Sequence, residues 1–514
     1  MALRHLKKVR VAVSLILFLC ALSIFLDLAG ALPPRVVAAI TTLQIVPAVL
    51  RALSGGAAAL IAAACILLLT LIVGRVYCSS ICPLGTLQDI FSRLNRGRNS
   101  VRRFRYRPQN YILHYGLLLL AAALAVGGSM TLLYLLEPFS TFGRLASTLL
   151  RPLAVAANNG VAAGLTALGS YAVFTVPFRV QSAVVIIGGV VSLAVLFVMS
   201  YTRGRLFCNT LCPAGALLGI VARYSLLKIA IDKSACKDCG LCEKVCKTGC
   251  MDSAEMRLDF NACVACFNCF DACPTVGLRF RRPRRQEEVP MNRRRRHVLR
   301  GAAGAAAMLV MPPDTLRAVL PAPTGKSRSL LPITPPGSGG IERFTSRCTA
   351  CHLCVSQCPT QVLTPAFLEY GAGGIFQPRM DYSVSPCTYE CTVCGNVCPT
   401  GAILPLTTDA KKLVQIGKAK FVRDDCIVIT KKTECGACSE HCPTKAVHMV
   451  KTEGHFLPEV NDDICIGCGS CEHPCPSTPN KAIYVDANPV HLAAKKPETT
   501  KPAPAPGTGS DFPF

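Results

Sequence analysis

Two short stretches decide the fold of this chain: they read CKDCGLCEKVC at residues 236–246 and CVACFNCFDACP at residues 263–274. In each stretch three cysteines are separated by two residues, and a fourth follows after three more. Bacterial two-cluster ferredoxins use this spacing, because three cysteines wrap one [4Fe–4S] cluster and the fourth reaches its neighbour. Zinc ribbons use paired C-x2-C knuckles instead, so the spacing favours iron–sulfur clusters over zinc.

The interleaved spacing gives each cluster of this pair a complete ligand set. We predict an α+β, ferredoxin-like domain over residues 231–283. Lys247 stands where the motif usually has proline, which affects a turn and not a ligand. One cluster would be held by Cys236, Cys239, Cys242 and Cys273, and the other by Cys263, Cys266, Cys269 and Cys246.

The chain before this domain is strongly apolar. Of the 514 residues, 51% are hydrophobic, and the mean hydropathy is +0.40. Apolar runs at residues 11–32, 56–73, 111–136 and 182–201 are long enough to cross a bilayer core of about 30 Å. Arginine-rich segments follow the second and fourth runs, which the positive-inside rule places in the cytoplasm. We predict a polytopic α-helical membrane domain over residues 1–230, and the net charge of +25 fits its cytoplasmic edges better than nucleic-acid binding.

An internal repeat lies within the apolar half. GRVYCSSICPLG at residues 74–85 is echoed by GRLFCNTLCPAG at residues 204–215. Parallel repeats related by an axis along the membrane normal would bring their four cysteines together near the cytoplasmic surface. The four are Cys78, Cys82, Cys208 and Cys212. They are candidates for an additional metal cluster; the alternatives are a pair of redox-active dithiols, or small residues that pack a helix turn.

Three ionisable residues lie near the ends of the predicted spans. Asp27 and Glu137 are near outer ends, and His114 is near an inner end. Such groups are costly in a membrane unless they handle protons or a ligand, so all three are candidates for a proton-accepting site. The alternative for each is snorkelling or helix-end capping. We expect residues 137–181 to be periplasmic and partly lipid-interfacial.

A second, larger cluster domain is predicted over residues 342–490, followed by a disordered tail at residues 491–514. Its four cysteine quartets each end in Cys-Pro and suffice for four more [4Fe–4S] clusters, six in all. The outer two quartets share the compact spacing, so we expect them to exchange their last cysteines, and the inner two to do likewise. Sequential pairing is the alternative. The quartets are Cys348, Cys351, Cys354, Cys358; Cys387, Cys391, Cys394, Cys398; Cys426, Cys435, Cys438, Cys442; and Cys465, Cys468, Cys471, Cys475.

Between the two cluster domains lies MNRRRRHVLRGAAGAAAMLVM, at residues 291–311. It is similar to a twin-arginine export motif with a weakly apolar run behind it. We predict an export segment over residues 284–320 that stays as a fifth membrane helix, and a linker at residues 321–341. The alternative is a basic cytoplasmic linker, which would keep both cluster domains inside.

Taken together, residues 1 to about 283 resemble the NapH-type membrane ferredoxins, which include MauN, and residues 291 to about 490 resemble the NapG-type ferredoxins, which include MauM. The twin Cys-x3-Cys-Pro repeats, the two-cluster domain, the twin-arginine stretch and the four quartets carry the resemblance. It implies a quinol dehydrogenase module in the bacterial inner membrane, with the first cluster domain cytoplasmic and the second periplasmic. Quinol would be the substrate, and a c-type cytochrome or periplasmic reductase in a multisubunit complex would accept the electrons.

Two other functions remain open. NosR-type and CcoG-type membrane ferredoxins share the Cys-x3-Cys-Pro repeats and resemble this chain in that part, which would imply a role in maturing or activating a metalloenzyme. A polyferredoxin facing the cytoplasm is the other. The sequence has no Gly-rich nucleotide fingerprint, so substrate chemistry other than electron transfer is expected elsewhere.

Overall fold

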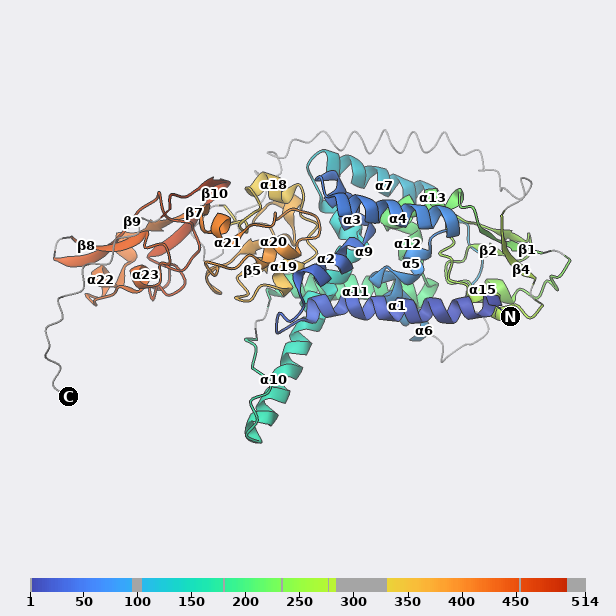
Figure 1. Ribbon diagram of the computed structural model, residues 1–514, viewed down its shortest axis with the longest axis horizontal. Coiled ribbons are helices and arrows are strands. Elements are labelled where there is room, and N and C mark those ends of the chain that lie inside the picture. The colour runs from blue at the N-terminus through green and yellow to red at the C-terminus, as the bar shows by residue number, and fades with distance from the viewer. Residues whose placement is uncertain are drawn as a thin grey trace.

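The computed structural model describes residues 2–94, 104–178, 181–232, 234–275, 277–282, 331–452 and 454–496. A helical unit lies in the middle of an elongated molecule, with a small cysteine-rich domain at each end (Figure 1). We call these the first cysteine-rich domain (residues 228–282) and the second cysteine-rich domain (residues 331–496). The predicted export segment at residues 284–320 lies outside the described residues.

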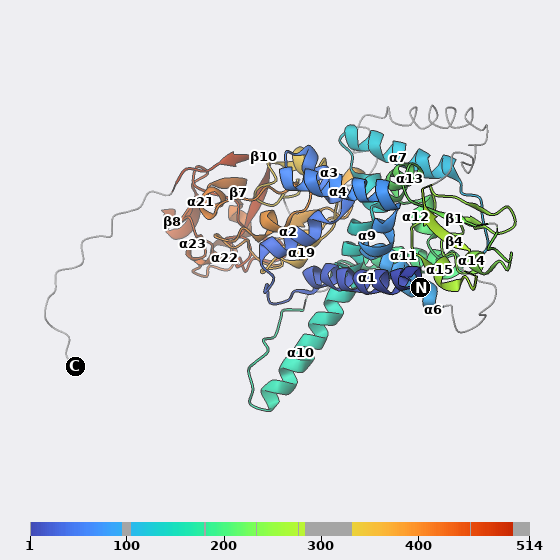
Figure 2. The same cartoon turned by 45° about the vertical axis from the view of Figure 1, so that its right-hand side comes forward.

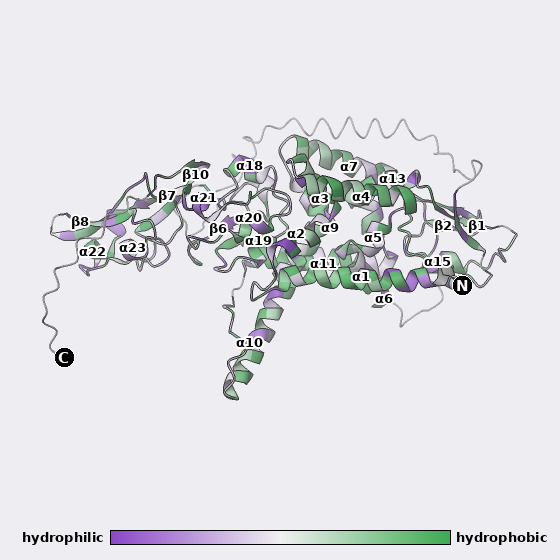
Figure 3. Cartoon of the chain, in the orientation of Figure 1, coloured by the Kyte–Doolittle hydropathy of each residue, from purple (hydrophilic) through white to green (hydrophobic). Residues whose placement is uncertain are grey.

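Four long helices run alongside one another in the helical unit (Figures 1 and 2). They are α1 (Ala2–Leu26), α4 (Ala57–Val73), α7 (Tyr111–Val126) and α11 (Ala183–Arg203). Each begins within or near one of the predicted apolar runs, and the unit is visibly more hydrophobic than either end domain (Figure 3). By length and composition α1 and α11 are able to cross a membrane, and the bent pair α2 (Pro34–Thr42) and α3 (Ile45–Leu53) is a third candidate.

Two of the long helices, α1 and α7, end earlier than the apolar runs that predicted them. Helix α1 stops at Leu26 because the Asp27 carboxylate accepts hydrogen bonds from the backbone N–H groups of Ala31 and Leu32, at 3.0 and 2.9 Å, and folds the chain into a turn. The third run is divided into α7 and a short α8 (Thr131–Leu136), because the chain turns at Gly128, where φ is +86°. A left-handed residue of this kind interrupts a helix.

Each Cys-x3-Cys-Pro repeat folds in the same way. A long helix is followed by a one-turn helix that carries the first cysteine, and then by a helix that begins at the proline after the second cysteine. Proline suits this first position because its missing N–H would have no partner there. The repeat elements are α5 (Val76–Ser80) and α6 (Pro83–Leu94), then α12 (Leu206–Thr210) and α13 (Pro213–Arg223).

The segment at residues 137–181, which we expect to be partly lipid-interfacial, is buried in its first part. It forms α9 (Pro138–Leu145), the π-helix η2 (Ala146–Leu150) and α10 (Arg151–Ala167), and every residue of α9 is buried. The rings of Phe139 and Phe142 pack on Phe25 of α1, with centroids 5.8 and 6.0 Å away. Of these three elements, α10 projects from the body, transverse to α1 (Figures 1 and 2).

The first cysteine-rich domain is built on two small antiparallel strand pairs. Strand β1 (Lys228–Ile231) pairs with β4 (Leu278–Arg281), and β2 (Met251–Asp252) pairs with β3 (Arg257–Leu258). Two short helices, α14 (Leu241–Lys244) and α15 (Asn268–Ala272), complete it. Helix α15 lies at the N-terminal end of α1, where Lys7 forms an ion pair with Asp271.

The second cysteine-rich domain contains three antiparallel strand pairs with short helices between them. The pairs are β5 (Leu363–Pro365) with β6 (Pro378–Met380), β7 (Val414–Phe421) with β10 (Ile483–Ala493), and β8 (Val447–Thr452) with β9 (His455–Val460). The helices are α18 (Ile341–Thr345), α19 (Leu353–Ser356), α20 (Val393–Val397), α21 (Thr408–Lys412), α22 (Ile427–Thr430) and α23 (Ala437–Glu440).

Both ends of this domain extend beyond the predicted boundaries. Thr334 and Ser338, within the predicted linker, are buried, and Gly340 forms a β-bridge with Val490. Strand β10 continues to Ala493, so the predicted tail begins too early. The reason is that the two segments pair with each other, and a composition argument cannot detect such pairing. Residues 497–514 lie outside the described residues.

Candidate functional site

Eight of the nine cysteines of the first cysteine-rich domain gather in two groups of four, and the ninth, Cys250, has its Sγ 3.5 Å from that of Cys246. Cys236, Cys239, Cys242 and Cys273 line one cavity, together with apolar side chains that include Ile231 and Leu278. Cys269 lies within electrostatic reach of Cys246, Cys263 and Cys266, and burial raises the pKa of its thiol well above the ordinary value. These are the same two groups that the interleaved spacing predicts as ligand sets.

The compact cysteine loops share one backbone conformation. In Cys236–Cys242, Cys263–Cys269, Cys348–Cys354 and Cys465–Cys471, the residues on both sides of the middle cysteine have positive φ. Non-glycine examples are Asp238, Phe267 and His352, at 52°, 58° and 60°. Left-handed residues cost energy unless the surroundings require them, and they turn successive N–H groups toward one point, which forms an anion-binding concavity common at Fe–S sites. The four loops therefore have a shape suited to an anionic cluster.

In the second cysteine-rich domain the first two quartets exchange their last cysteines. Burial raises the pKa of the Cys354 thiol well above its ordinary value, and the thiols of Cys351, Cys348, Cys398 and Cys394 raise it further. Two groups result: Cys348, Cys351, Cys354 with Cys398, which we call the helix-facing set, and Cys387, Cys391, Cys394 with Cys358.

The last two quartets exchange their cysteines in the same manner. One cavity is lined by Cys426, Cys435, Cys438 and Cys475, which we call the distal set. In the other group, Cys442 lies near Cys465, Cys468 and Cys471. The expected pairing of the outer quartets with each other, and the inner with each other, was therefore wrong. The domain is built as two consecutive ferredoxin units, and the β7–β10 pair closes the second of them. The backbone N–H of Cys387 donates to the carbonyl of Cys468 at 3.0 Å and joins the units.

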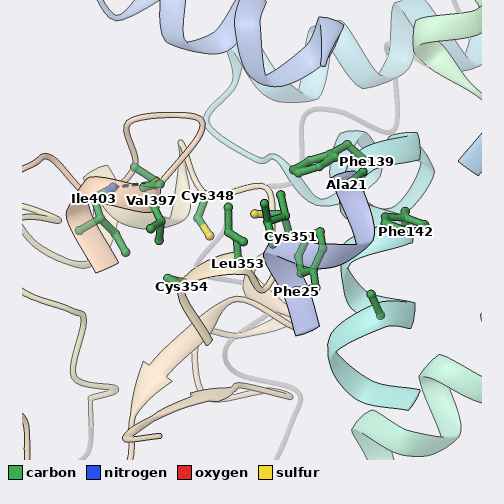
Figure 4. Packing of buried hydrophobic residues seen from close by; sticks show 14 of the residues in the cluster. Ala21, Phe25, Phe139, Phe142, Cys348, Cys351, Leu353, Cys354, Val397 and Ile403 are labelled. Atoms are coloured by element: carbon green, nitrogen blue, oxygen red, sulfur yellow. Dashed lines mark hydrogen bonds between the residues drawn. The ribbon is translucent and has the colours of Figure 1, made fainter. Parts of the chain in front are cut away.

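The helix-facing set lies directly against the helical unit. A Cβ atom added to Gly143 of α9 would lie 2.3 Å from the carbonyl oxygen of Cys351 and 2.8 Å from the ring of Phe25. Only glycine permits so close an approach. Figure 4 shows Cys351 beside Phe25, with Phe139 and Phe142 on the neighbouring helix. Gln357 donates to the carbonyl of Ile24 at 2.6 Å and further ties this loop to the end of α1.

His352, between two cysteines of the helix-facing set, links the two parts of the chain through its ring. The ring is buried, with Nε2 2.8 Å from the carbonyl oxygen of Phe376 and Nδ1 3.2 Å from Ser147 Oγ in the helical unit. Burial lowers the pKa of His352 to about 3, which keeps the ring neutral. The Nε2–H group then donates to Phe376, and Nδ1 accepts from the Ser147 hydroxyl.

The repeats bring Cys78, Cys82, Cys208 and Cys212 together inside the helical unit, and we call these the four-cysteine site. All four are buried, with 3–4% of each residue exposed. The site lies beside the first cysteine-rich domain, because Asn209 donates to the carbonyl of Ala262 at 3.3 Å.

The three ionisable candidates do not share a site. Asp27 caps the turn after α1, and Glu137 caps α9 by accepting hydrogen bonds from the backbone N–H groups of Phe139 and Ser140. His114 is buried beside the four-cysteine site, with Nε2 3.2 Å from the carbonyl of Cys212. Glu137 lies within electrostatic reach of Cys351, a predicted cluster ligand in the second cysteine-rich domain.

Sequence reasoning missed several buried charged residues around these sites. Lys411 is buried and its Nζ donates to the carbonyl oxygens of Thr388 and Tyr389, within electrostatic reach of Cys387. Arg144 donates to the carbonyl of Tyr134 at 2.9 Å and lies within electrostatic reach of Cys351. Arg144 could have been noticed in the sequence, because it is the one charged residue at residues 138–150. Lys411 lies in an ordinary polar stretch and does not stand out.

Two family models match segments of the chain that carry many of its cysteines. A family described as "4Fe-4S binding domain" matches residues 56–102, 185–234 and 392–416, and a "4Fe-4S dicluster domain" matches residues 347–402 and 433–478. The chain is 30% identical to the ferredoxin-type protein NapF of Escherichia coli K12 over 157 residues, which cover 30% of this chain and 87% of NapF. This chain belongs to the ferredoxin-type iron–sulfur proteins.

Two further ferredoxin-type proteins show the same relationship. Identity to NapG of Escherichia coli K12 is 32% over 203 residues, 36% of this chain and 82% of NapG. Identity to the methylamine utilization ferredoxin-type protein MauM of Methylophilus methylotrophus is 31% over 186 residues, 34% of this chain and 76% of MauM. These relatives confirm an iron–sulfur electron-transfer protein.

Other relatives are matched over less of their length. The chain spans 35% of an uncharacterized protein of Methanocaldococcus jannaschii at 34% identity, and 51% of the putative electron transport protein YccM of Escherichia coli K12 at 24% identity. No solved structure matches the chain. The two dicluster matches each cover most of one sequential pair of quartets, in agreement with the pairing found in the structure.

Proposed function

We propose that this ferredoxin-type protein is anchored in a membrane, takes electrons from quinol and passes them along [4Fe–4S] clusters to an acceptor protein. The observation that carries the proposal is the direct contact between the helix-facing set and the helical unit, at Gly143 and Cys351. A donor dissolved in the membrane would meet a cluster at this contact without a soluble intermediate. The NapH-type and NapG-type resemblance of the two parts points to the same reaction.

The arrangement of the two end domains supports opposite sides of the membrane. Helix α1 has 25 residues and is about 37 Å long, against a hydrocarbon core of about 30 Å. Lys7 at one end contacts the first cysteine-rich domain, and Ile24 at the other contacts the second. If α1 crosses the membrane, the positive-inside rule leaves the first domain in the cytoplasm and the second in the periplasm. The twin-arginine stretch would then export the second domain.

Twenty-four cysteines would hold six clusters, each of which supplies one-electron transfer when bound. The chain's own residues would bury the ligands and set the order of transfer. Electrons would enter at the helix-facing set and cross to the group that contains Cys387. They would pass from the first ferredoxin unit to the second at the Cys387–Cys468 contact and leave from the distal set. Quinol oxidation releases protons, and Glu137 is the best placed of the three acceptor candidates because it lies near Cys351.

The acceptor would dock near the distal set, at the end of the second domain farthest from the helical unit (Figure 1). Phe456, on the neighbouring strand β9, is 55% exposed. We propose a c-type cytochrome or a periplasmic reductase within a multisubunit complex. The NapG-type resemblance of the second domain supports this choice of acceptor.

Reduction by quinol tests the function. Purified full-length protein in nanodiscs is mixed anaerobically with a quinol analogue, and bleaching of the iron–sulfur absorbance is followed. Rapid bleaching is the expected result. Clusters that are reduced by dithionite but not by the quinol would overturn quinol oxidation and favour a protein that exchanges electrons with soluble donors.

A further inference from the structure

We propose that the buried ammonium group of Lys411 raises the reduction potentials of two clusters that meet at the junction of the two ferredoxin units. One cluster belongs to the group that contains Cys387, and the other belongs to the group that contains Cys468. The inference requires these clusters and does not depend on quinol as the donor. Three observations carry it: a short segment that holds Lys411 between two cysteine loops, the lack of a carboxylate partner, and the nearness of Lys411 to both groups.

Helix α21 holds Lys411 against the first of these loops. The side chain of Thr407 caps this helix at its N-terminus. The Lys411 Nζ donates to the carbonyl oxygens of Thr388 and Tyr389, the second at 2.8 Å. These two residues follow Cys387 directly in the sequence, so the ammonium group is fixed beside that cysteine.

Strand β7, which begins three residues after Lys411, holds the second loop. Gln415 is buried, and its Nε2 donates to the carbonyl oxygen of Cys465 at 2.6 Å. The loop also packs closely on the strand, because a Cβ atom added to Gly467 would lie 2.5 Å from the carbonyl oxygen of Gly417. A single short segment therefore holds a cysteine loop from each ferredoxin unit, and Lys411 lies within it.

Lys411 carries a charge that no carboxylate neutralises at close range. The residue is 3% exposed, and it forms no ion pair with any residue that the structure describes. Glu390 is within its electrostatic reach, but that carboxylate is bonded to Lys412 at 2.7 Å and its side chain is 67% exposed, so water screens it. A buried charge is strongly unfavourable unless it is compensated, and carbonyl dipoles compensate it only in part. Anionic clusters beside Lys411 would supply the remainder.

Both groups of cysteines lie within reach of this charge. Burial raises the pKa of the Cys387 thiol to about 12, and the positive charge of Lys411 opposes that rise. Burial likewise raises the pKa of the Cys468 thiol, and Lys411 opposes that rise as well. The two cysteines lie side by side, since the backbone N–H of Cys387 donates to the carbonyl of Cys468 at 3.0 Å. Lys411 is therefore close to the point at which the two groups meet.

A cation in this position acts on electrons as well as on protons. A [4Fe–4S] cluster with four thiolate ligands is anionic, and reduction adds one more negative charge. A nearby cation in a medium of low dielectric stabilises the reduced form more than the oxidised form, so it raises the reduction potential. Each transfer across the junction oxidises one cluster and reduces the other. Because Lys411 faces both, the electron would be stabilised on either side of the junction.

A redox titration of the full-length protein, followed by electron paramagnetic resonance, tests the proposal. Dithionite is the reductant, so the result is independent of whether quinol is the donor. The variant Lys411→Gln keeps a donor for the two carbonyl oxygens and removes the charge. The matched control is Lys412→Gln, which removes the neighbouring, partly exposed charge. Two midpoint potentials should shift downward in Lys411→Gln and none in the control. Wild-type potentials in Lys411→Gln, or equal shifts in both variants, would overturn the proposal.

A third variant, Lys411→Arg, separates the charge from the packing of the side chain. It restores a cation, so both midpoint potentials should lie near the wild-type values even if the larger side chain lowers the thermal midpoint. Potentials as low as those of Lys411→Gln would show that charge is not the cause and would overturn the proposal. Iron content is measured for every variant, and Lys411→Met replaces Lys411→Gln if the latter loses iron. Loss of iron from both would assign Lys411 to cluster assembly and would also overturn it.

Discussion

At the scale of single residues, the contact between the helical unit and the second cysteine-rich domain depends on Gly143. Sequence alone gives no indication of this, because the residue that it meets, Cys351, lies more than two hundred positions later. The cysteines of the compact quartets are different: their spacing is local, and it predicts the loop shape that the structure shows. Local geometry was predictable here, and long-range packing was not.

The substitution Gly143→Ala tests this contact. The added methyl group would meet the Cys351 carbonyl and the Phe25 ring, and overpacking of this kind costs about 1–3 kcal/mol. We expect a lower thermal midpoint and slower reduction by quinol. The matched control is Gly160→Ala on α10, where an added Cβ meets nothing within 4 Å. Equal midpoints and rates in the two variants would show that the contact does not contribute.

His491 predicts a pH dependence of stability at the same scale. Burial lowers the pKa of His491 to about 4, below its ordinary 6.5, while Nε2 contacts Thr334 Oγ1 at 2.8 Å. The unfolded chain therefore binds a proton between these pH values and the folded chain does not, so stability falls as pH drops from about 6.5 toward 4. Chemical denaturation between pH 7 and 5 measures the loss. His491→Gln should show a weaker pH dependence; an unchanged dependence would count against this role.

Among the elements, the apolar residues of the segment 137–181 are informative about α10 and not about α9. Helix α9 is not at a lipid interface, because it is buried within the helical unit and meets the second cysteine-rich domain at Gly143. A partly lipid-interfacial position remains a prediction for α10. The helix and the chain that returns from it are joined by Asn158, whose Nδ2 donates to the carbonyl of Phe174 at 2.9 Å. Leu153, Leu168, Tyr171 and Phe174 are 68–83% exposed, and residues 152–178 contain no acidic or basic side chain. Such a surface suits a membrane interface.

Single tryptophans can test the position of α10, because the chain contains none. In nanodiscs, the fluorescence of Phe174→Trp should be quenched by lipids brominated near the headgroup and little by aqueous iodide. Leu19→Trp, on the exposed side of α1, reports on the bilayer interior, and Phe456→Trp reports on water. If iodide quenched Phe174→Trp as strongly as it quenches Phe456→Trp, α10 would not lie at the interface. If iodide quenched Leu19→Trp and not Phe174→Trp, α1 would not span the membrane.

The pairing of the cysteine quartets differs from the pairing that their spacing predicted. Matching spacing suggested that the outer quartets share clusters, but the chain folds as two consecutive units, one closed by α19 and α20 and the other by β7 and β10. Spacing determines which cysteines can act as ligands, because each loop wraps its own cluster. It does not determine which loop supplies the crossing cysteine, because that depends on how the units pack.

At the scale of the whole molecule, the elongated shape places predicted clusters at both ends of the helical unit. If the twin-arginine stretch exports the second domain, Arg295→Lys/Arg296→Lys should leave that domain in the cytoplasm while the first domain is unchanged. Protease added to spheroplasts measures this, with Cys20→Ser as a control that leaves the signal intact. The C-terminal domain should be digested in the control and protected in the variant; digestion in both would argue against export by this signal.

The proposed function requires that electrons enter from quinol at the helix-facing set. The most direct measurement follows the reduction of individual clusters by electron paramagnetic resonance, after quinol is mixed with the wild type or with Cys351→Ser/Cys398→Ser in nanodiscs. We predict that quinol reduces the clusters of the second cysteine-rich domain in the wild type, and that in the variant the remaining clusters of that domain respond to dithionite but not to quinol. Quinol-driven reduction of those clusters in the variant, at the wild-type rate, would contradict the claim.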